Sequence, residues 1–134
     1  MTQEDKKLLL KDLSARLPYG VMIQIPELFY PQRKVIEKLV TINDLWHFND
    51  DGTYIENVKP YLRPMSSMTE EEYKELKLIS SYYGFAPYKY IDDWCPNYEM
   101  IDWLNKNMFD YRGLIEKGLA IEVTEKNNPY ETRR

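Results

Sequence analysis

The chain has 134 residues but only one cysteine, Cys95, and one histidine, His47. A single cysteine cannot form an internal disulfide bond, and these two residues are too few ligands for a tetrahedral zinc site. The apolar runs are too short to span a membrane, and the first residues lack the order of a signal peptide. We therefore expect a cytoplasmic protein in a reducing compartment, with no metal, no cofactor and no membrane partner.

The five glycines are dispersed, so the sequence has no glycine-rich phosphate loop, and a nucleotide-using enzyme is not expected. The chain also has few residues that could activate a catalytic nucleophile. Cys95 would need His47 as its base, and the nearby carboxylates Asp92 and Asp93 disfavour its thiolate. Carboxylate pairs can carry out acid–base chemistry when buried, so an unusual enzyme built on Asp92, Asp93 or Glu99 stays an open alternative. We otherwise expect no enzymatic activity.

The net charge is −4, and the excess negative charge lies in the second half of the chain. Residues 1–66 hold nine Lys or Arg and nine Asp or Glu, whereas residues 67–134 hold nine and thirteen. Broad binding to a nucleic-acid backbone requires a clustered basic face, which this balance disfavours. A small basic patch in the first half remains compatible with it.

The N-terminal segment has the pattern of an amphipathic helix. Leu9 and Leu13 recur at helical spacing, and the charged residues, Asp12 among them, fall largely elsewhere. Thr2 is suited to cap the first turn, and a Pro-Tyr-Gly sequence ends the helix after residue 17. A helix this short is marginal in isolation, so its leucines are expected to pack against the rest of the domain.

Short apolar runs separated by turn residues predict strands in the next part of the chain. The runs Val35–Ile42, Leu45–Phe48 and Thr53–Val58 are joined by two short stretches rich in Asn and Asp, the second ending in Asp-Gly. This arrangement favours an antiparallel meander of three strands. His47 would then lie in the middle strand, where a lone histidine is usually a surface residue and not a metal ligand.

The run Val35–Ile42 carries apolar residues on both faces, which is typical of a strand that is covered on both sides. Together with Val21–Ile25 and a short strand at Tyr61–Arg63, the segment 21–63 resembles a small, partly closed SH3-like barrel. Pro60 has no backbone donor, so we expect the chain to cross the surface there and not to continue a ladder.

Thr69 and Glu72 form a capping-box pattern, which predicts a helix that starts at about Thr69. The acidic first turn suits the positive end of the helix dipole. Tyr73 and Leu76 recur at helical spacing as part of its core face, and Gly84 is expected to end it.

Residues 85–95 have no clean period and are interpreted as an aromatic loop. The apolar spacing from Met100 to Met108 predicts a third helix, and Asp110 is suited to cap a shorter one that runs through Lys117. The alternation in Leu119–Val123 predicts a final strand.

These patterns predict one α+β domain over residues 1–125. It would comprise an N-terminal helix, a small antiparallel sheet or SH3-like partly closed barrel at about 21–63, and a helical C-terminal half at about 69–118. Residues 126–134 are expected to form a flexible tail.

The chain has 12 tyrosines, and its aromatic residues concentrate in residues 82–111. Tyr and Trp suit surfaces that are packed on one side and wet on the other, binding surfaces included, although core packing is their more common role. We therefore predict a non-catalytic interaction module that binds another protein or a second copy of the chain. The candidate contact residues are Tyr61, Arg63, Tyr88, Tyr90 and Trp94.

The alternative is a nucleic-acid-binding protein in which a small barrel offers aromatic rings for base stacking. In that case basic residues of the near-neutral first half would follow the phosphate backbone, and the acidic second half would face away. The residues for this role are Arg33, Lys34, Lys59 and Arg63.

Two stretches of the chain, Lys59–Thr69 and Asp110–Ala120, resemble a family of small uncharacterised proteins from Bacteroides genomes and their prophage-like regions. The resemblance covers about a sixth of the chain. It implies an accessory protein of a phage or mobile element, and it implies neither an activity nor roles for particular residues.

Overall fold

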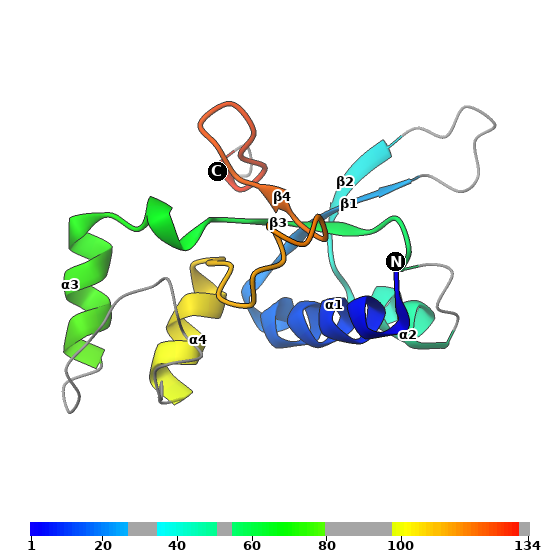
Figure 1. Ribbon diagram of the computed structural model, residues 1–134, viewed down its shortest axis with the longest axis horizontal. Coiled ribbons are helices and arrows are strands. Elements are labelled where there is room, and N and C mark those ends of the chain that lie inside the picture. Colours follow the sequence, from blue (N-terminus) through cyan, green and yellow to red (C-terminus); the bar gives the residue numbers. More distant parts are fainter. Residues whose placement is uncertain (27–34, 51–54, 80–97, 132–134) are drawn as a thin grey trace.

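The structure is a computed structural model, and it describes residues 1–26, 35–50, 55–79 and 98–131 (Figure 1). Its described part is of the α+β class with a helix at the N-terminus, as predicted. The helices are α1 (Gln3–Arg16), α2 (Ile42–Asp50), α3 (Glu70–Ile79) and α4 (Tyr98–Lys106), with 3-10 helices η1 (Leu17–Tyr19) and η2 (Met65–Ser67). The strands are β1 (Met22–Pro26), β2 (Val35–Leu39), β3 (Lys59–Leu62) and β4 (Ile121–Glu122). None of the described helices is long and apolar enough to cross a membrane.

The described strands form one sheet in the order β2-β1-β3-β4. Strand β1 pairs antiparallel with β2 and with β3, whereas β3 pairs in parallel with β4. The sheet is therefore mixed and not wholly antiparallel, because a strand from the C-terminal part of the chain joins it. The described strands do not close on themselves, so the partly closed barrel is not confirmed.

Helix α1 begins where the sequence predicts. The Asp5 backbone N–H donates to Thr2 Oγ1 (3.0 Å), and the Thr2 N–H donates to Asp5 Oδ2 (3.2 Å), which makes a capping box. Leu9 and Leu13 are fully buried, as expected. Asp12 is also fully buried, so the prediction that it lies on the charged side of the helix is wrong.

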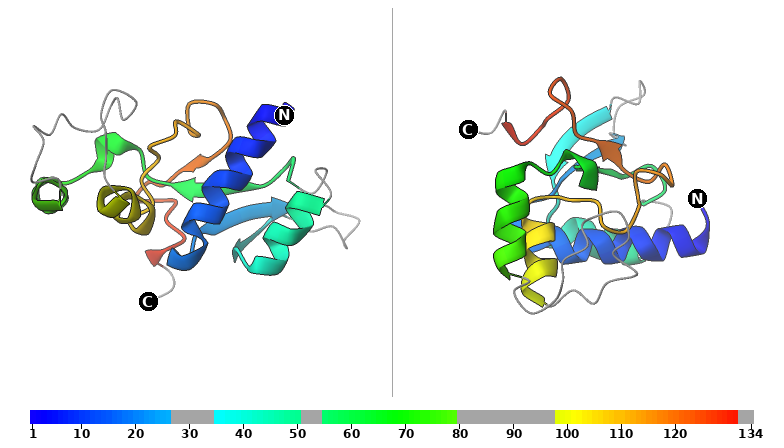
Figure 2. Two further views of the ribbon diagram at one scale, coloured as in Figure 1. Left: turned by 90° about the horizontal axis from the view of Figure 1, so that it is seen from below. Right: turned by 60° about the vertical axis from the view of Figure 1, so that its left-hand side comes forward.

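The main hydrophobic core lies between α1, α2 and one face of the sheet (Figures 1 and 2). Leu9 and Leu13 of α1 pack in it with Ile23 of β1, Leu62 of β3 and Phe48 of α2. Helix α1 crosses this face of the sheet, and α2 lies beside it (Figure 2).

A second core cluster joins α3 and α4. Helix α4 contacts both α3 and α1 and lies between them in Figure 1. Leu76 of α3, which the sequence places in the core, is fully buried. The buried members of the cluster are Leu76, Met100, Trp103, Leu104 and Phe109.

Helix α2 corrects the predicted meander. Leu45–Phe48, interpreted as its middle strand with His47, is helical. The Asp44 N–H donates to Thr41 Oγ1 (3.2 Å), and the Thr41 N–H donates to Asp44 Oδ2 (2.9 Å). This reciprocal cap starts a helix where the sequence was interpreted as a turn, and Leu45 and Phe48 then face the core because they are three residues apart.

The third predicted strand, Thr53–Val58, is also wrong as far as the structure describes it. Residues 55–57 form a turn, in which the Val58 N–H donates to the Ile55 carbonyl (3.1 Å). Residues 53 and 54 lie outside the described residues.

Strand β3 is interior to the sheet, which corrects the expectation of a surface crossing at Pro60. Pro60 pairs with Ile23 of β1, and Tyr61 pairs with Ile121 of β4. The first half of β3 thus pairs with one neighbour and its second half with the other. Pro60 and Tyr61 are both buried, so the missing proline donor does not keep this stretch at the surface.

The C-terminal part is less helical than predicted. Asp110–Lys117, expected to be a short helix, forms turns. Asp110 still acts as a cap, because its two carboxylate oxygens accept hydrogen bonds from the N–H groups of Leu114 (2.8 Å) and Ile115 (2.9 Å). The strand predicted at Leu119–Val123 is present as the two-residue β4.

Residues 126–131, within the segment predicted as a tail, contact the sheet. The Tyr130 hydroxyl accepts a hydrogen bond from the Met22 N–H of β1 (3.1 Å) and donates one to the Tyr61 carbonyl of β3 (2.7 Å). The last regular pair between β1 and β3 is Ile23 with Pro60, so Met22 and Tyr61 would form the next pair in that register. The hydroxyl therefore bridges β1 and β3 at the point where their regular pairing stops.

Candidate functional site

The connection between β3 and α3 is shaped by a tight turn and a second capping box. In η2, the Ser67 N–H and Oγ both donate to the Pro64 carbonyl (2.9 and 2.8 Å). The Glu72 N–H donates to Thr69 Oγ1 (3.1 Å), and the Thr69 N–H donates to Glu72 Oε1 (3.0 Å). The predicted cap of α3 is thus confirmed, and it fixes where the helix leaves the turn.

Arg63 fastens this connection to the second core cluster. Its Nη1 and Nη2 each donate to one oxygen of the Glu72 carboxylate at 2.7 Å, and Nη2 also donates to the Ser67 carbonyl (3.3 Å). Its guanidinium lies over the Phe109 ring, 4.2 Å from the ring centroid. The hydrogen bonds from Arg63 hold the pKa of Glu72 below its ordinary value.

A pocket of about 760 Å³ lies beside η2 and the first turns of α3. Its α3 residues, at positions 70, 73, 74 and 77, follow the i, i+3, i+4, i+7 spacing of one helix face. The volume falls within the range of about 300–1,000 Å³ that is common for ligand pockets. The described residues that line this α3 pocket are Met65, Ser66, Met68, Thr69, Glu70, Tyr73, Lys74 and Lys77.

The α3 pocket combines an apolar wall with a charged rim. Met65 and Met68 are partly buried and pack against the second core cluster, which supports the apolar wall of the pocket. Tyr73 is partly exposed, whereas Lys74 and Lys77 are exposed. Methionine side chains are flexible and polarisable, which lets a surface adapt to different apolar groups. The arrangement is suited to holding a bulky apolar group with polar atoms around it.

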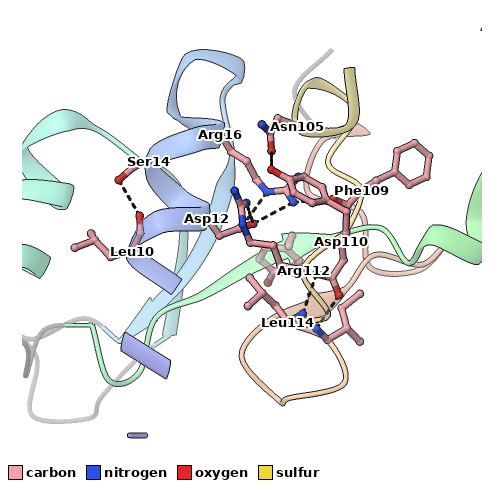
Figure 3. Close-up of polar contacts among 12 residues, drawn as sticks. Leu10, Asp12, Ser14, Arg16, Asn105, Phe109, Asp110, Arg112 and Leu114 are labelled. Carbon is pink, nitrogen blue, oxygen red and sulfur yellow. Dashed lines mark hydrogen bonds and ion pairs between the residues drawn. The ribbon is translucent and has the colours of Figure 1, made fainter. Parts of the chain in front are cut away.

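A second cluster of polar side chains is buried and fastens α1 to the loop after α4 (Figure 3). Asp12 and Arg16 are both fully buried and form a bidentate pair, with Arg16 Nε 2.9 Å from Asp12 Oδ2 and Nη2 3.2 Å from Oδ1. Arg112 Nη1 donates to the same Oδ1 (2.7 Å), and Arg16 Nη2 donates to the Phe109 carbonyl (2.6 Å). Because Asp12 and Arg16 have no exposed surface, we assign this cluster a structural role.

Two neighbours complete this cluster. The Tyr111 ring lies near both guanidiniums, 5.3 Å from Cζ of Arg16 and 4.6 Å from Cζ of Arg112, and its hydroxyl donates to Asn105 Oδ1 (2.8 Å). Burial raises the pKa of Tyr111. Burial also raises the pKa of Asp110, and its two backbone donors offset this only in part.

Of the predicted contact residues, Tyr61 and Arg63 lie in the described structure. Tyr61 is 1% exposed, and its hydroxyl donates to Glu37 Oε1 (2.8 Å) and accepts from Gln24 Nε2 (3.4 Å). Its ring therefore packs inside the protein, with no surface for a partner. Arg63 lies beside the α3 pocket, where its charge is paired with that of Glu72.

Most other sequence candidates are not brought together by the described structure. Lys59 is exposed at the start of β3, and Glu99 is exposed on α4. His47 is exposed on α2, with its ring edge-to-face with Trp46 at 5.2 Å between centroids. Within the described ranges no group of three His, Cys, Asp or Glu residues could hold a metal ion. The candidates outside the described residues are Arg33, Lys34, Tyr88, Tyr90, Asp92, Asp93, Trp94 and Cys95.

The α3 pocket was not predicted from the sequence. Tyr73 was assigned to the core face of α3, but it lines the pocket, whereas Leu76 one turn on is in the core. The spacing of Lys74 and Lys77 beside Tyr73 was the available signal, since it places two lysines and a tyrosine on one side of the helix. The contribution of Met65 and Met68 has no such signal, because it depends on the turn that η2 makes.

None of the family models, curated proteins and solved structures compared with this chain matches it.

Proposed function

We propose that this protein is a non-catalytic interaction module that binds a segment of another protein in the α3 pocket. The observation that carries the proposal is a formed pocket of about 760 Å³ with a wall of methionine and tyrosine side chains. Buried apolar and aromatic anchors supply most of the energy in protein interfaces. The described lining residues include no histidine or cysteine, and their only carboxylate is Glu70.

The pocket wall is held in place by contacts within the protein. Arg63 binds Glu72 through both terminal nitrogens and lies on Phe109, so the start of α3 is held against the second core cluster. Met68 follows η2 and packs against the same cluster. A binding surface that is already ordered loses less conformational entropy when a partner docks, which favours binding.

Nucleic-acid binding receives less support from the described residues. Arg63 is paired with Glu72, and Lys59 is the one other residue of the proposed basic set within the described ranges. The open sheet also lacks the barrel surface on which base stacking was expected to occur. This alternative is tested by nuclease treatment in the experiment below.

The experiment is capture of partners from a lysate of the organism that encodes the protein, with and without nuclease. Ser66→Trp places a bulky ring at an exposed position of the pocket lining, and Ser14→Trp makes the same change on the exposed side of α1. We expect a partner that survives nuclease and binds the wild type and Ser14→Trp, but not Ser66→Trp. Equal capture by all three proteins would contradict the proposal. Loss on nuclease treatment would favour nucleic-acid binding. Equal urea midpoints for the two variants would exclude misfolding.

The aromatic candidates in residues 82–94 need their own test because they lie outside the described residues. Replacing Tyr88, Tyr90 and Trp94 together by Ala should also reduce capture if they contact the same partner. If the triple variant captures the partner normally while Ser66→Trp does not, the α3 pocket alone accounts for binding. If the triple variant unfolds, these rings belong to the core.

A further inference from the structure

Two of the three charged side chains among the described residues that line the α3 pocket are lysines. Lys74 and Lys77 lie three residues apart on the pocket side of α3, and both are exposed. Lys74 has no ion pair with any described residue, although Glu70 is four residues before it on the same side of the helix. The charge of Arg63, the nearest arginine in sequence, is already paired with Glu72. Lys74 is therefore a positive charge at the pocket that no described carboxylate pairs with.

The charges along the pocket are also ordered. Glu70 lies at the N-terminal end of α3, and the lysines lie one and two turns further on. A ligand carboxylate is repelled near Glu70 and attracted near Lys74, so the two ends of the pocket prefer different groups. Met65, Met68 and Tyr73 line the same pocket as these charged residues.

We infer that the α3 pocket binds an acidic, amphipathic peptide segment. A bulky apolar side chain occupies the wall of Met65, Met68 and Tyr73, and an Asp or Glu close to it in sequence lies against Lys74. This inference deepens the proposed function and rests on it. The acidic group lies toward the C-terminal end of α3, because Glu70 disfavours a carboxylate at the other end.

The test is selection from a random peptide library displayed on phage, with the 134-residue chain immobilised. The wild type should enrich peptides that carry an apolar anchor next to Asp or Glu, and Ser66→Trp should not enrich them. Lys74→Glu, at an exposed position outside the core, should lose the preference for acidic peptides. The best peptide, labelled for fluorescence anisotropy, should bind Lys74→Glu about tenfold more weakly than the wild type, a change of about 1.4 kcal/mol. The affinity for the wild type should fall as salt is added.

The outcomes separate the inference from the proposed function. Enrichment of neutral or basic peptides that is abolished by Ser66→Trp would overturn the inference and leave the proposed function standing. Equal binding of the acidic peptide and of a version with Asn and Gln in place of Asp and Glu would also overturn the inference and leave the proposed function standing. Enrichment that is unaffected by Ser66→Trp, or no enrichment at all, would overturn both.

Discussion

Removal of one oxygen atom from Tyr130 should destabilise the sheet. In Tyr130→Phe the ring is kept, so hydrophobic packing changes little, but the bridge between the Met22 N–H and the Tyr61 carbonyl is lost. Both residues are buried, with 8% and 1% of their surfaces exposed, so water replaces the hydroxyl poorly. We expect the free energy of unfolding to fall.

The magnitude follows from the number of groups affected. A hydrogen bond contributes about 0.5–1.5 kcal/mol net, and a buried group left without a partner costs about 1–3 kcal/mol. Two backbone groups lose the Tyr130 hydroxyl. Two lost hydrogen bonds at the net value correspond to about 1–3 kcal/mol, which is the loss that we expect.

The measurement is urea unfolding followed by fluorescence, for which Trp103, buried and stacked on Phe109 at 5.6 Å, is a suitable probe. Tyr98→Phe makes the same change at a side chain that is 89% exposed and should leave the midpoint unchanged. Hydrogen exchange at the Met22 amide should accelerate in Tyr130→Phe alone. A loss below about 0.5 kcal/mol would refute the bridge, because it is smaller than one net hydrogen bond.

Alkaline titration examines the same contact independently. Burial raises the pKa of Tyr130 from 10.0 to about 12, and burial with the hydrogen bond to Glu37 does the same for Tyr61. A raised folded-state pKa means that this contribution to stability is full below pH 10 and is lost as the pH rises toward 12. Absorbance of tyrosinate should therefore show one fewer late-titrating group in Tyr130→Phe than in the wild type.

Three further changes test the other polar contacts. Asp12→Ala should cost about 3–5 kcal/mol in urea unfolding, because it leaves the buried Arg16 charge uncompensated, and replacing both by apolar residues should restore part of this. The lowered pKa of Glu72 means that its pairing with Arg63 stabilises above the ordinary value of 4.5 and is lost as the pH falls through the folded pKa. In Glu72→Gln the free energy of unfolding should therefore fall less as the pH is lowered than it does in the wild type. Thr69→Ala should cost about 1 kcal/mol, and an unchanged midpoint would contradict the cap.

Helix starts could be predicted from the sequence because both partners of each cap lie within four residues. Thr2 with Asp5 and Thr69 with Glu72 are complete interactions in the sequence, and the structure contains both. Thr41 with Asp44 carries the same signal. The run Leu45–Phe48 is nevertheless interpreted as a strand in the sequence, because a short apolar run between turn residues fits a strand as well as a helix.

The buried face of α1 shows where a local pattern stops being sufficient. Leucines predict which side of the helix is buried, and that prediction holds for Leu9 and Leu13. Asp12 and Arg16 are buried as well, because each neutralises the other and Arg112 adds a second donor from the far end of the chain. A buried pair of this kind depends on a residue 100 positions away, so the sequence alone assigned Asp12 to solvent.

The same limit applies to the candidate site. Tyr61 is a predicted contact residue because tyrosine suits surfaces that are packed on one side and wet on the other, but its side chain is buried and its hydroxyl donates to Glu37 of β2, 24 residues earlier in the chain. Arg63 and Glu72 are nine residues apart, and Arg63 binds Glu72 while its guanidinium lies over the Phe109 ring. These contacts join the start of α3 to a residue beyond α4. The side chains that line the pocket therefore come from one short stretch of sequence, whereas the position of the pocket depends on contacts with a residue beyond α4.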